Sequence, residues 1–543
     1  MKTAPVSPTI NDTTRERVII GVCALVAIAL GIVAATSSSE LTAALFTVLL
    51  FSTTAFILPR AWLGIVLIAL IPLQFYFPIT ASQYLRGAFV FVVAATLRLV
   101  VLRLSSFVIR PSFVFRPSSF VLRPPSWLLP VALFLAAAFV AALGATNRYL
   151  ALKGIVDWLP VFAAAFVIGE TMPPRWLKRF VVALVTVGVL EALLGLLQTR
   201  FTPAQIAEVL QIPLSHWFYQ PNLLRERLAE FSFNWLAGNR VLPFGTFING
   251  IDYALFLAAM VGLASAWLMQ VAGGRRQEAG GGEQAAGGRW QEAGGRRQAA
   301  GGEQNDCLPP TASRLLLTAY CLLSIALIGI ALLLTYKGSG LLALAGAGAV
   351  LVWALGVTRA TASRLLPPAS RFPPTASWLL AGVLLLGIVF FEPLVQRGAF
   401  LIQRESSASY ETGRLEIWGQ ALAALPQRPF FGFGLNNAGQ LIAPTQSLRG
   451  GTFIAVANAP ESAYVATLVE TGVIGFAALL WFIGAVLVRA YQRARASLLY
   501  AGVLAAIVAL LCGNLTVNGL TTDQNGLLLG VLVGMVFAPN VPN

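Results

Sequence analysis

ESAYVATLVETGVIGFAALLWFIGAVLV, residues 461–488, has charges only at Glu461 and Glu470 in a run otherwise dominated by apolar side chains. A helix needs about 20 predominantly apolar residues to cross about 30 Å of hydrocarbon. This stretch is long enough, so it predicts a helix that spans a membrane.

The rest of the chain has the same character. Of its 543 residues, 57% are hydrophobic and 11% are charged, and the mean hydropathy is +0.77. These values lie outside the range of soluble globular proteins. We predict an all-α fold, a polytopic transmembrane bundle of about fourteen spans with two large extracytoplasmic loops that contain short helices. The predicted spans are residues 18–35, 41–58, 61–77, 87–104, 127–145, 150–169, 176–198, 248–270, 315–335, 338–357, 378–395, 461–488, 498–515 and 527–538.

The basic residues predict the orientation. The net charge is +15, but the arginines are spread over short loops and not gathered in one domain, which argues against a nucleic-acid partner. With a cytoplasmic N-terminus, every strongly basic short loop falls inside, as the positive-inside rule requires. We expect a multi-pass protein of the cytoplasmic (inner) membrane with both termini in the cytoplasm.

This topology divides the chain into five units. Three cytoplasmic loops are low in complexity and repetitive, and such composition predicts flexible, dispensable segments. The units are an N-terminal bundle of spans 1–7 (residues 1–198), a first large extracytoplasmic loop (199–247), spans 8–11 (248–396, with low-complexity cytoplasmic loops 272–314 and 358–377), a second large extracytoplasmic loop that is the candidate catalytic loop (397–460), and the C-terminal spans (461–543).

The second large loop contains Ile417, Ala421, Leu422 and Leu425 at helical spacing. Two interpretations are open. An amphipathic helix of this kind lies on the outer surface of the membrane, or it packs over the helical bundle.

Cysteine and histidine usage limits the chemistry. Cys23, Cys321 and Cys512 fall in predicted spans and Cys307 in a cytoplasmic loop, so we expect no structural disulfide. His216 is the only histidine, and the sequence has no metal-ligand spacing. We expect neither a metal nor a cofactor.

Ionisable side chains in the predicted spans concentrate in the outer half of the membrane. Each costs about 2.5–3.5 kcal/mol at the bilayer centre, so their distribution suggests a polar cavity open to the outside. Lys153 and Asp157 are four residues apart, so they alternatively neutralise each other. The full set is Lys153, Asp157, Glu191, Asp252, Lys337 and Glu392.

Four segments, mostly in the C-terminal half, carry recognisable motifs. They are Arg240 with PFGTFINGIDYALF (243–256), LTYKGSGLLAL (334–344), GRLEIWGQALAALPQRPFFGFGLNNAG (413–439) and ESAYVATLVETGVIG (461–475). In this order they resemble the O-antigen ligase and polymerase superfamily, membrane-embedded enzymes that transfer or polymerise lipid-linked glycans outside the cytoplasmic membrane.

Two positions depart from that pattern. The superfamily's Ser-Arg pair reads Lys337-Gly338 here, and the register of Glu470 and Gly472 places Glu461 where ligases carry a histidine. The resemblance therefore implies a polymerase-like variant that lacks the ligase histidine.

The resemblance implies a metal-independent glycosyltransferase. It would polymerise or transfer polyprenyl-pyrophosphate-linked oligosaccharide on the extracytoplasmic face, as in O-antigen, lipopolysaccharide or exopolysaccharide synthesis. The implied partners are this lipid-linked glycan, membrane lipids and other polysaccharide-assembly proteins, with no nucleic acid. The alternative is a transporter of the same superfamily for a small anion such as bicarbonate or for another solute.

The resemblance also implies roles for individual residues. Arg414 and Glu461 are the catalytic candidates, because a guanidinium binds phosphate through two hydrogen bonds and a carboxylate can take the proton of an attacking sugar hydroxyl. Glu461 alternatively stabilises the start of the following helix, where acidic residues favour the helix dipole. The candidate substrate-binding residues are Arg240, Lys337, Arg404 and Arg428.

Overall fold

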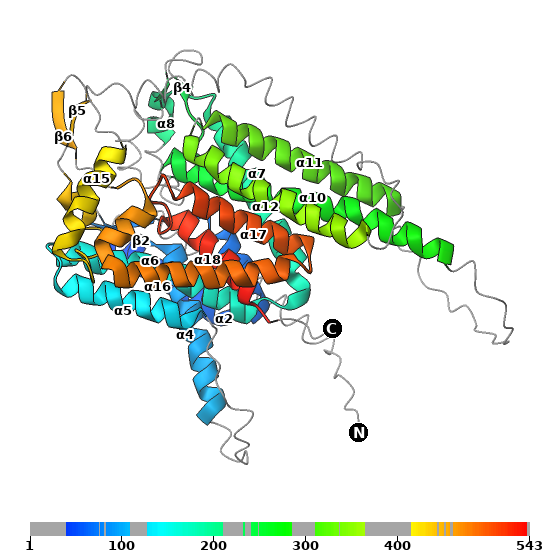
Figure 1. The fold of residues 1–543 in the computed structure, drawn as a ribbon, viewed down its shortest axis with the longest axis horizontal. Coiled ribbons are helices and arrows are strands. Elements are labelled where there is room, and N and C mark those ends of the chain that lie inside the picture. Colours follow the sequence, from blue (N-terminus) through cyan, green and yellow to red (C-terminus); the bar gives the residue numbers. More distant parts are fainter. Residues whose placement is uncertain are drawn as a thin grey trace.

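The protein is a bundle of long helices, seen in a computed structural model (Figure 1). Two of the predicted spans, residues 18–35 and 378–395, lie outside the described residues. The structure describes residues 40–74, 76–80, 83–108, 127–209, 232–233, 240–247, 249–284, 310–335, 337–363, 414–442, 445–449, 452–456 and 460–539.

The described helices follow the apolar runs of the sequence. Three two-stranded antiparallel ribbons accompany them: β1–β2 (Tyr76–Thr80, Gln83–Arg86), β3–β4 (Ser232–Phe233, Arg240–Val241) and β5–β6 (Thr445–Arg449, Thr452–Val456). The helices are α2 (Glu40–Ile57), α3 (Arg60–Ala69), α4 (Gly87–Val108), α5 (Leu128–Leu143), α6 (Arg148–Thr171), α7 (Leu177–Gln198), α8 (Pro203–Val209), α10 (Gly250–Gln284), α11 (Pro310–Leu334), α12 (Gly338–Ser363), α15 (Arg414–Ala424), α16 (Ala463–Ala494), α17 (Leu498–Gly513) and α18 (Asp523–Phe537).

Six of the described helices are long and apolar enough to cross a membrane. They are α6, α7, α11, α12, α16 and the part of α10 up to Val271, while α3, α5, α17, α18 and the part of α2 from Val48 are shorter apolar helices. The prediction of a multi-pass helical membrane protein is therefore confirmed, and the total of fourteen spans stays a prediction.

One predicted span, residues 61–77, is wrong, and two helices run past the predicted ends of their spans. α3 ends at Ala69 and β1 begins at Tyr76, so no single helix covers residues 61–77; Pro72 disfavours helical backbone at the residue before it. α10 runs on to Gln284 and α12 to Ser363. Both predicted low-complexity loops therefore begin as helix, because extending a formed helix costs far less than nucleating one.

Close packing holds the bundle together. α10 packs against α7, α11, α12 and α17, while α6 packs against α4, α5 and α18. Glycines allow the closest of these approaches: a β-carbon on Gly530 of α18 would stand 2.4 Å from the Val161 carbonyl oxygen of α6, and one on Gly534 would stand 2.5 Å from Ile168. Small residues at helix contacts are typical of membrane bundles, where apolar burial between helices contributes little.

The described parts of the two large loops lie at the same end of the bundle. Figure 1 shows α8, β4, α15 and the β5–β6 ribbon gathered there. The helices alternate in direction, so the turns after α5, α7, α11 and α17 reach this same end. We call it the loop end, and it corresponds to the side that the sequence analysis predicts to be extracytoplasmic.

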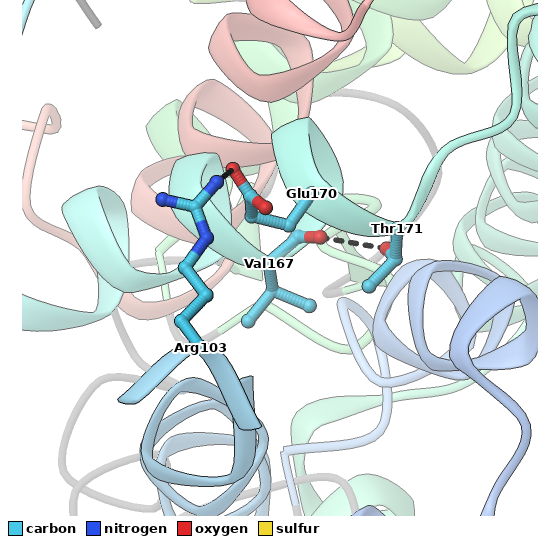
Figure 2. A network of polar contacts seen from close by, with 4 residues as sticks. All are labelled: Arg103, Val167, Glu170 and Thr171. Carbon is cyan, nitrogen blue, oxygen red and sulfur yellow. Dashed lines mark hydrogen bonds and ion pairs between the residues drawn. The ribbon is translucent and has the colours of Figure 1, made fainter. Parts of the chain in front are cut away.

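Basic side chains tie the helices at the opposite end. Arg103 of α4 forms an ion pair of 2.6 Å with Glu170 of α6, shown in Figure 2, and Thr171 donates a hydrogen bond to Val167 beside it. Arg493 is buried and donates to the Tyr500 hydroxyl and to main-chain carbonyls at the end of α18.

Candidate active site

Two of the predicted site residues meet at the loop end of the bundle. Arg414 is the first residue of α15, and its Nε lies 2.5 Å from Oε2 of Glu461, just before α16. The side chains are 44% and 51% exposed. An exposed ion pair contributes only about 0.2–1 kcal/mol to folding, so the pair stays accessible and can be separated by a ligand.

The start of α16 is capped by a different residue. Ser462 has extended backbone and its hydroxyl accepts a hydrogen bond from the Val465 N–H, as an N-cap residue does. Glu461 precedes this cap and turns its carboxylate to Arg414. Among the described contacts, no main-chain N–H of the first turn of α16 donates to the Glu461 carboxylate, so the alternative role of Glu461 at the helix start has no hydrogen bond to support it.

α15 is held by its apolar side. Ile417 and Ala421 are buried in a cluster with Phe433, Ala438 and Val469. This side of the helix faces the protein, which fits the interpretation that α15 packs over the bundle. Packing of these residues fixes where the helix begins, and with it the position of Arg414.

α16 is interrupted at Gly472, which has φ 65° and ψ −172° inside an otherwise helical run. The interruption exposes main-chain groups, and the turn 429–434 binds to them. Phe433 N–H donates to Val469 O and Gly434 N–H to Glu470 O, while Pro429 O and Phe430 O accept from the next turn of α16. The third and fourth sequence motifs therefore form one structural unit.

Glycine is required on both sides of this contact. A β-carbon on Gly472 would stand 2.4 Å from the Phe430 carbonyl, and one on Gly432 would stand 2.4 Å from the Val469 oxygen. Gly432 and Gly434 have φ of 69° and 91°, values that residues with a β-carbon rarely adopt. The Gly-x-Gly turn and the Gly472 break thus fit each other.

Glu470 supports the same unit from inside the bundle. It is buried, and its carboxylate accepts a hydrogen bond of 3.3 Å from the Ala438 N–H. This contact gives Glu470 a structural role. It also links the break in α16 to the short 3-10 helix Ala438–Leu441, against which α15 packs.

The first motif is anchored on α7. Thr246 donates to Glu191 from its main-chain N–H at 2.9 Å and from its hydroxyl at 2.8 Å. Gln198 donates to Gly245 O and accepts from Gly245 N–H. Sequence reasoning had no role for Gln198, although its spacing of seven residues from Glu191 places both on one helix face.

In the part of the chain that the structure describes, Lys153, Asp157 and Glu191 of the outer-half charges have separate partners. Lys153 and Asp157 form an ion pair of 2.8 Å, as the neutralisation alternative predicts, and Asn436 donates to Asp157. Glu191 and Glu470 are buried and bound to main-chain N–H groups. A small pocket at the loop end is lined by Asp157 together with Gln74, Arg86, Thr521 and Thr522.

The other predicted site residues are more scattered. Arg428 is exposed, donates to the Gly144 carbonyl and lies over the Phe433 ring at 5.2 Å, so it belongs to the same loop as Arg414. Lys337 is half-buried between α11 and α12. Arg240 pairs through its main chain with Phe233 in the β3–β4 ribbon, and Arg404 lies outside the described residues, as do His216 and Glu392.

Sequence reasoning missed the two asparagines that dock this loop on α6. Asn437 accepts from the Asn147 N–H and donates to the Asn147 carbonyl. Asn436 has a positive φ of 59°, which asparagine tolerates better than most residues. The available signal was their position two and three residues after the Gly-x-Gly turn.

Comparison with known proteins supports the resemblance. Residues 323–480 match the family described as O-antigen ligase, and this range contains Lys337, Arg414, Arg428 and Glu461 but not Arg240. A search of the curated proteins finds no match to the chain. The superfamily resemblance is thereby confirmed for residues 323–480 of this membrane protein, which are similar to the O-antigen ligase family.

Proposed function

We propose that this protein is a glycosyltransferase that polymerises or transfers polyprenyl-pyrophosphate-linked oligosaccharide on the extracytoplasmic face of the cytoplasmic membrane. The similarity of residues 323–480 to the O-antigen ligase family supports a glycosyltransferase of membrane lipid-linked glycans. Arg414 and Glu461 are the proposed catalytic residues, with the loop end of the bundle facing outward.

The observation that carries the proposal is the Arg414–Glu461 contact. The two residues come from separate motifs, they meet at 2.5 Å, and both are about half exposed. They lie within the matched domain. A cation suited to a pyrophosphate and a carboxylate suited to a proton are therefore side by side at a surface that a lipid headgroup can reach.

The chemistry follows from this pair. In the reaction the acceptor hydroxyl oxygen forms a bond to the anomeric carbon of the donor sugar, and the bond from that carbon to the phosphate oxygen breaks. The pyrophosphate leaves with the electron pair, and Arg414 stabilises its growing negative charge through charge-assisted hydrogen bonds. The hydroxyl proton passes to Glu461.

Donor binding would also prepare the base. In the structure the Arg414 guanidinium donates a hydrogen bond to Oε2 of Glu461. A pyrophosphate that takes over the guanidinium releases the carboxylate to accept a proton. Arg428, on the same loop, is the proposed second phosphate contact, with Lys337, Arg404 and Arg240 as further substrate-binding residues.

Glu461 in place of the ligase histidine favours polymerisation of repeat units over transfer to a lipid acceptor. The deciding experiment is the lipid-linked glycan profile of source cells with and without this chain. A polymerase predicts that single lipid-linked repeat units accumulate when the chain is missing. A ligase predicts that long lipid-linked glycans accumulate, and an unchanged profile would contradict both.

A reconstituted assay tests the catalytic pair directly. Vesicles containing the full chain and a polyprenyl-pyrophosphate oligosaccharide should form longer glycans, and Arg414→Ala should abolish this. The matched control is Arg103→Ala, which removes a similarly exposed ion pair at the opposite end of the bundle and should leave product formation intact.

A further inference from the structure

The turn 429–434 reaches below the loop end of the bundle, alongside helices that span the membrane. Its C-terminal end lies near the end of α5, because a β-carbon on Gly434 would touch Ala145, and the side chain of Arg428, just before the turn, donates to the Gly144 carbonyl. Its tip lies deeper, because Pro429 O and Phe430 O accept from the N–H groups of Val473 and Ile474 in α16.

The neighbouring helices give the depth of the tip. Gly475, one residue beyond Ile474, lies beside Ala137 of α5. Ala137 is six residues before α5 ends at Leu143, which corresponds to roughly 9 Å of helix at about 1.5 Å per residue. The tip of the turn is therefore level with the interior of two apolar helices and not with their ends.

The side chains at this level are apolar and uncovered. Phe430 is 66% exposed and Phe431 39%, next to Val473 at 51% and Ile474 at 42%. Residues 429–434 include no charged side chain. Exposed apolar side chains on helices that span a membrane face its hydrocarbon, and the turn continues their surface through its hydrogen bonds to α16.

The main chain of the turn is also suited to hydrocarbon. Non-helical backbone is tolerated at membrane depth only where it is buried in protein, with hydrogen-bond partners there, or lines a water-filled cavity, and Gly432, Phe433 and Gly434 of this turn are buried. The Gly472 break supplies those partners: Phe433 and Gly434 donate to α16 at 3.2 and 2.8 Å, and Pro429 and Phe430 accept from it at 2.9 and 3.2 Å. An uninterrupted helix would have used the same groups internally.

We propose that residues 429–434 form a re-entrant turn that enters the outer leaflet, and that Phe430 and Phe431 bind the acyl chains of bilayer lipids. The turn thereby tethers the loop that carries Arg414 and Arg428 to the membrane. This inference rests on the packing of the turn against α16 and does not depend on the proposed glycan chemistry.

A depth measurement tests the inference. Phe430 is replaced in the full chain by p-acetylphenylalanine, whose ketone takes a nitroxide label without involving the native cysteines, and the protein is placed in phospholipid vesicles. Because Phe430 is largely exposed, the substitution leaves the buried core intact. The same label at Trp481 of α16, 50% exposed, serves as the lipid reference, and at exposed Glu416 of α15 as the aqueous reference.

The expected result is that dissolved oxygen relaxes the label at 430 strongly and a water-soluble nickel chelate relaxes it weakly, as for the label at 481. Relaxation by nickel as strong as at 416 would overturn the proposal. So would exclusion of nickel that appears only after a polyprenyl phosphate is added, because the surface would then bind the donor chain and not the bilayer.

A second measurement uses the unmodified protein. A phospholipid with a photoreactive diazirine in its acyl chain should label residues 429–434 as well as the exposed residues of α16. Labelling of α16 with an unlabelled turn would contradict the proposal.

Discussion

Arg414 and Glu461 are 47 positions apart in the sequence, yet their side chains meet at 2.5 Å. The chain between them passes through the turn 429–434, which is bound to the break in α16 at Gly472. Because Glu461 lies just before α16 and α15 packs on the same helix, the break helps to set the distance between the two side chains.

Glu461→Gln should lower turnover by about 10²- to 10⁴-fold, because the amide keeps the size of the side chain but cannot accept the hydroxyl proton. Donor binding and protein level should remain close to normal. Product formed per minute in reconstituted vesicles is the measurement, with Glu170→Gln as the control at the opposite end. Near-full activity of Glu461→Gln would show that the carboxylate is not the base.

Arg414→Lys should weaken donor binding more than it lowers the rate at which the bound donor reacts. An ammonium cannot reproduce the two hydrogen bonds of a guanidinium to phosphate, and losing one bond to a charged group costs about 1.5–3 kcal/mol. KM for the donor should therefore rise by about tenfold or more. A KM unchanged from that of the wild type would remove Arg414 from the donor site, and Arg103→Lys is the matched control.

Gly472→Ala should destabilise the protein, since the position needs a positive φ and a β-carbon would overlap the Phe430 main chain at 2.4 Å. Strain of this kind costs about 1–3 kcal/mol for the backbone conformation alone. Gly484→Ala in the same helix is the control, because nothing lies within 4 Å of its added β-carbon and alanine favours helix. The midpoint of thermal unfolding in detergent should fall for the first variant only.

An external protease should reach one end of the bundle and spare the other. The positive-inside arrangement predicts that residues 285–309 are cytoplasmic, while residues 450–451, between β5 and β6, are outside. A protease site inserted at 450–451 should be cut in intact spheroplasts, and the same site within 285–309 only after lysis. Cutting of the second site in intact spheroplasts would reverse the proposed orientation of the active site.

Local patterns in the sequence determined most of the helices. Hydropathy acts over one span at a time, so the apolar runs predicted α2, α5, α6, α7 and α17 to within two residues of their observed bounds. The effect of a single helix-breaking residue was harder to predict: Pro72 lies within the predicted span 61–77, and α3 ends before it at Ala69. The motifs also identified the loop that carries Arg414 and the residue Glu461.

Only the tertiary structure decided how these pieces meet. Hydropathy could not reveal that Gly472 interrupts α16, because the cost of that break is offset by hydrogen bonds to a turn some 40 positions earlier in the chain. Hydropathy also could not distinguish Glu191 and Glu470 from Glu461. The first two are buried and accept hydrogen bonds from main-chain N–H groups, whereas Glu461 is exposed beside Arg414. The sequence by itself determined which residues are apolar enough to span the membrane and which can carry charge. The partner of each charge depends on contacts between distant segments, and those form only when the helices pack together.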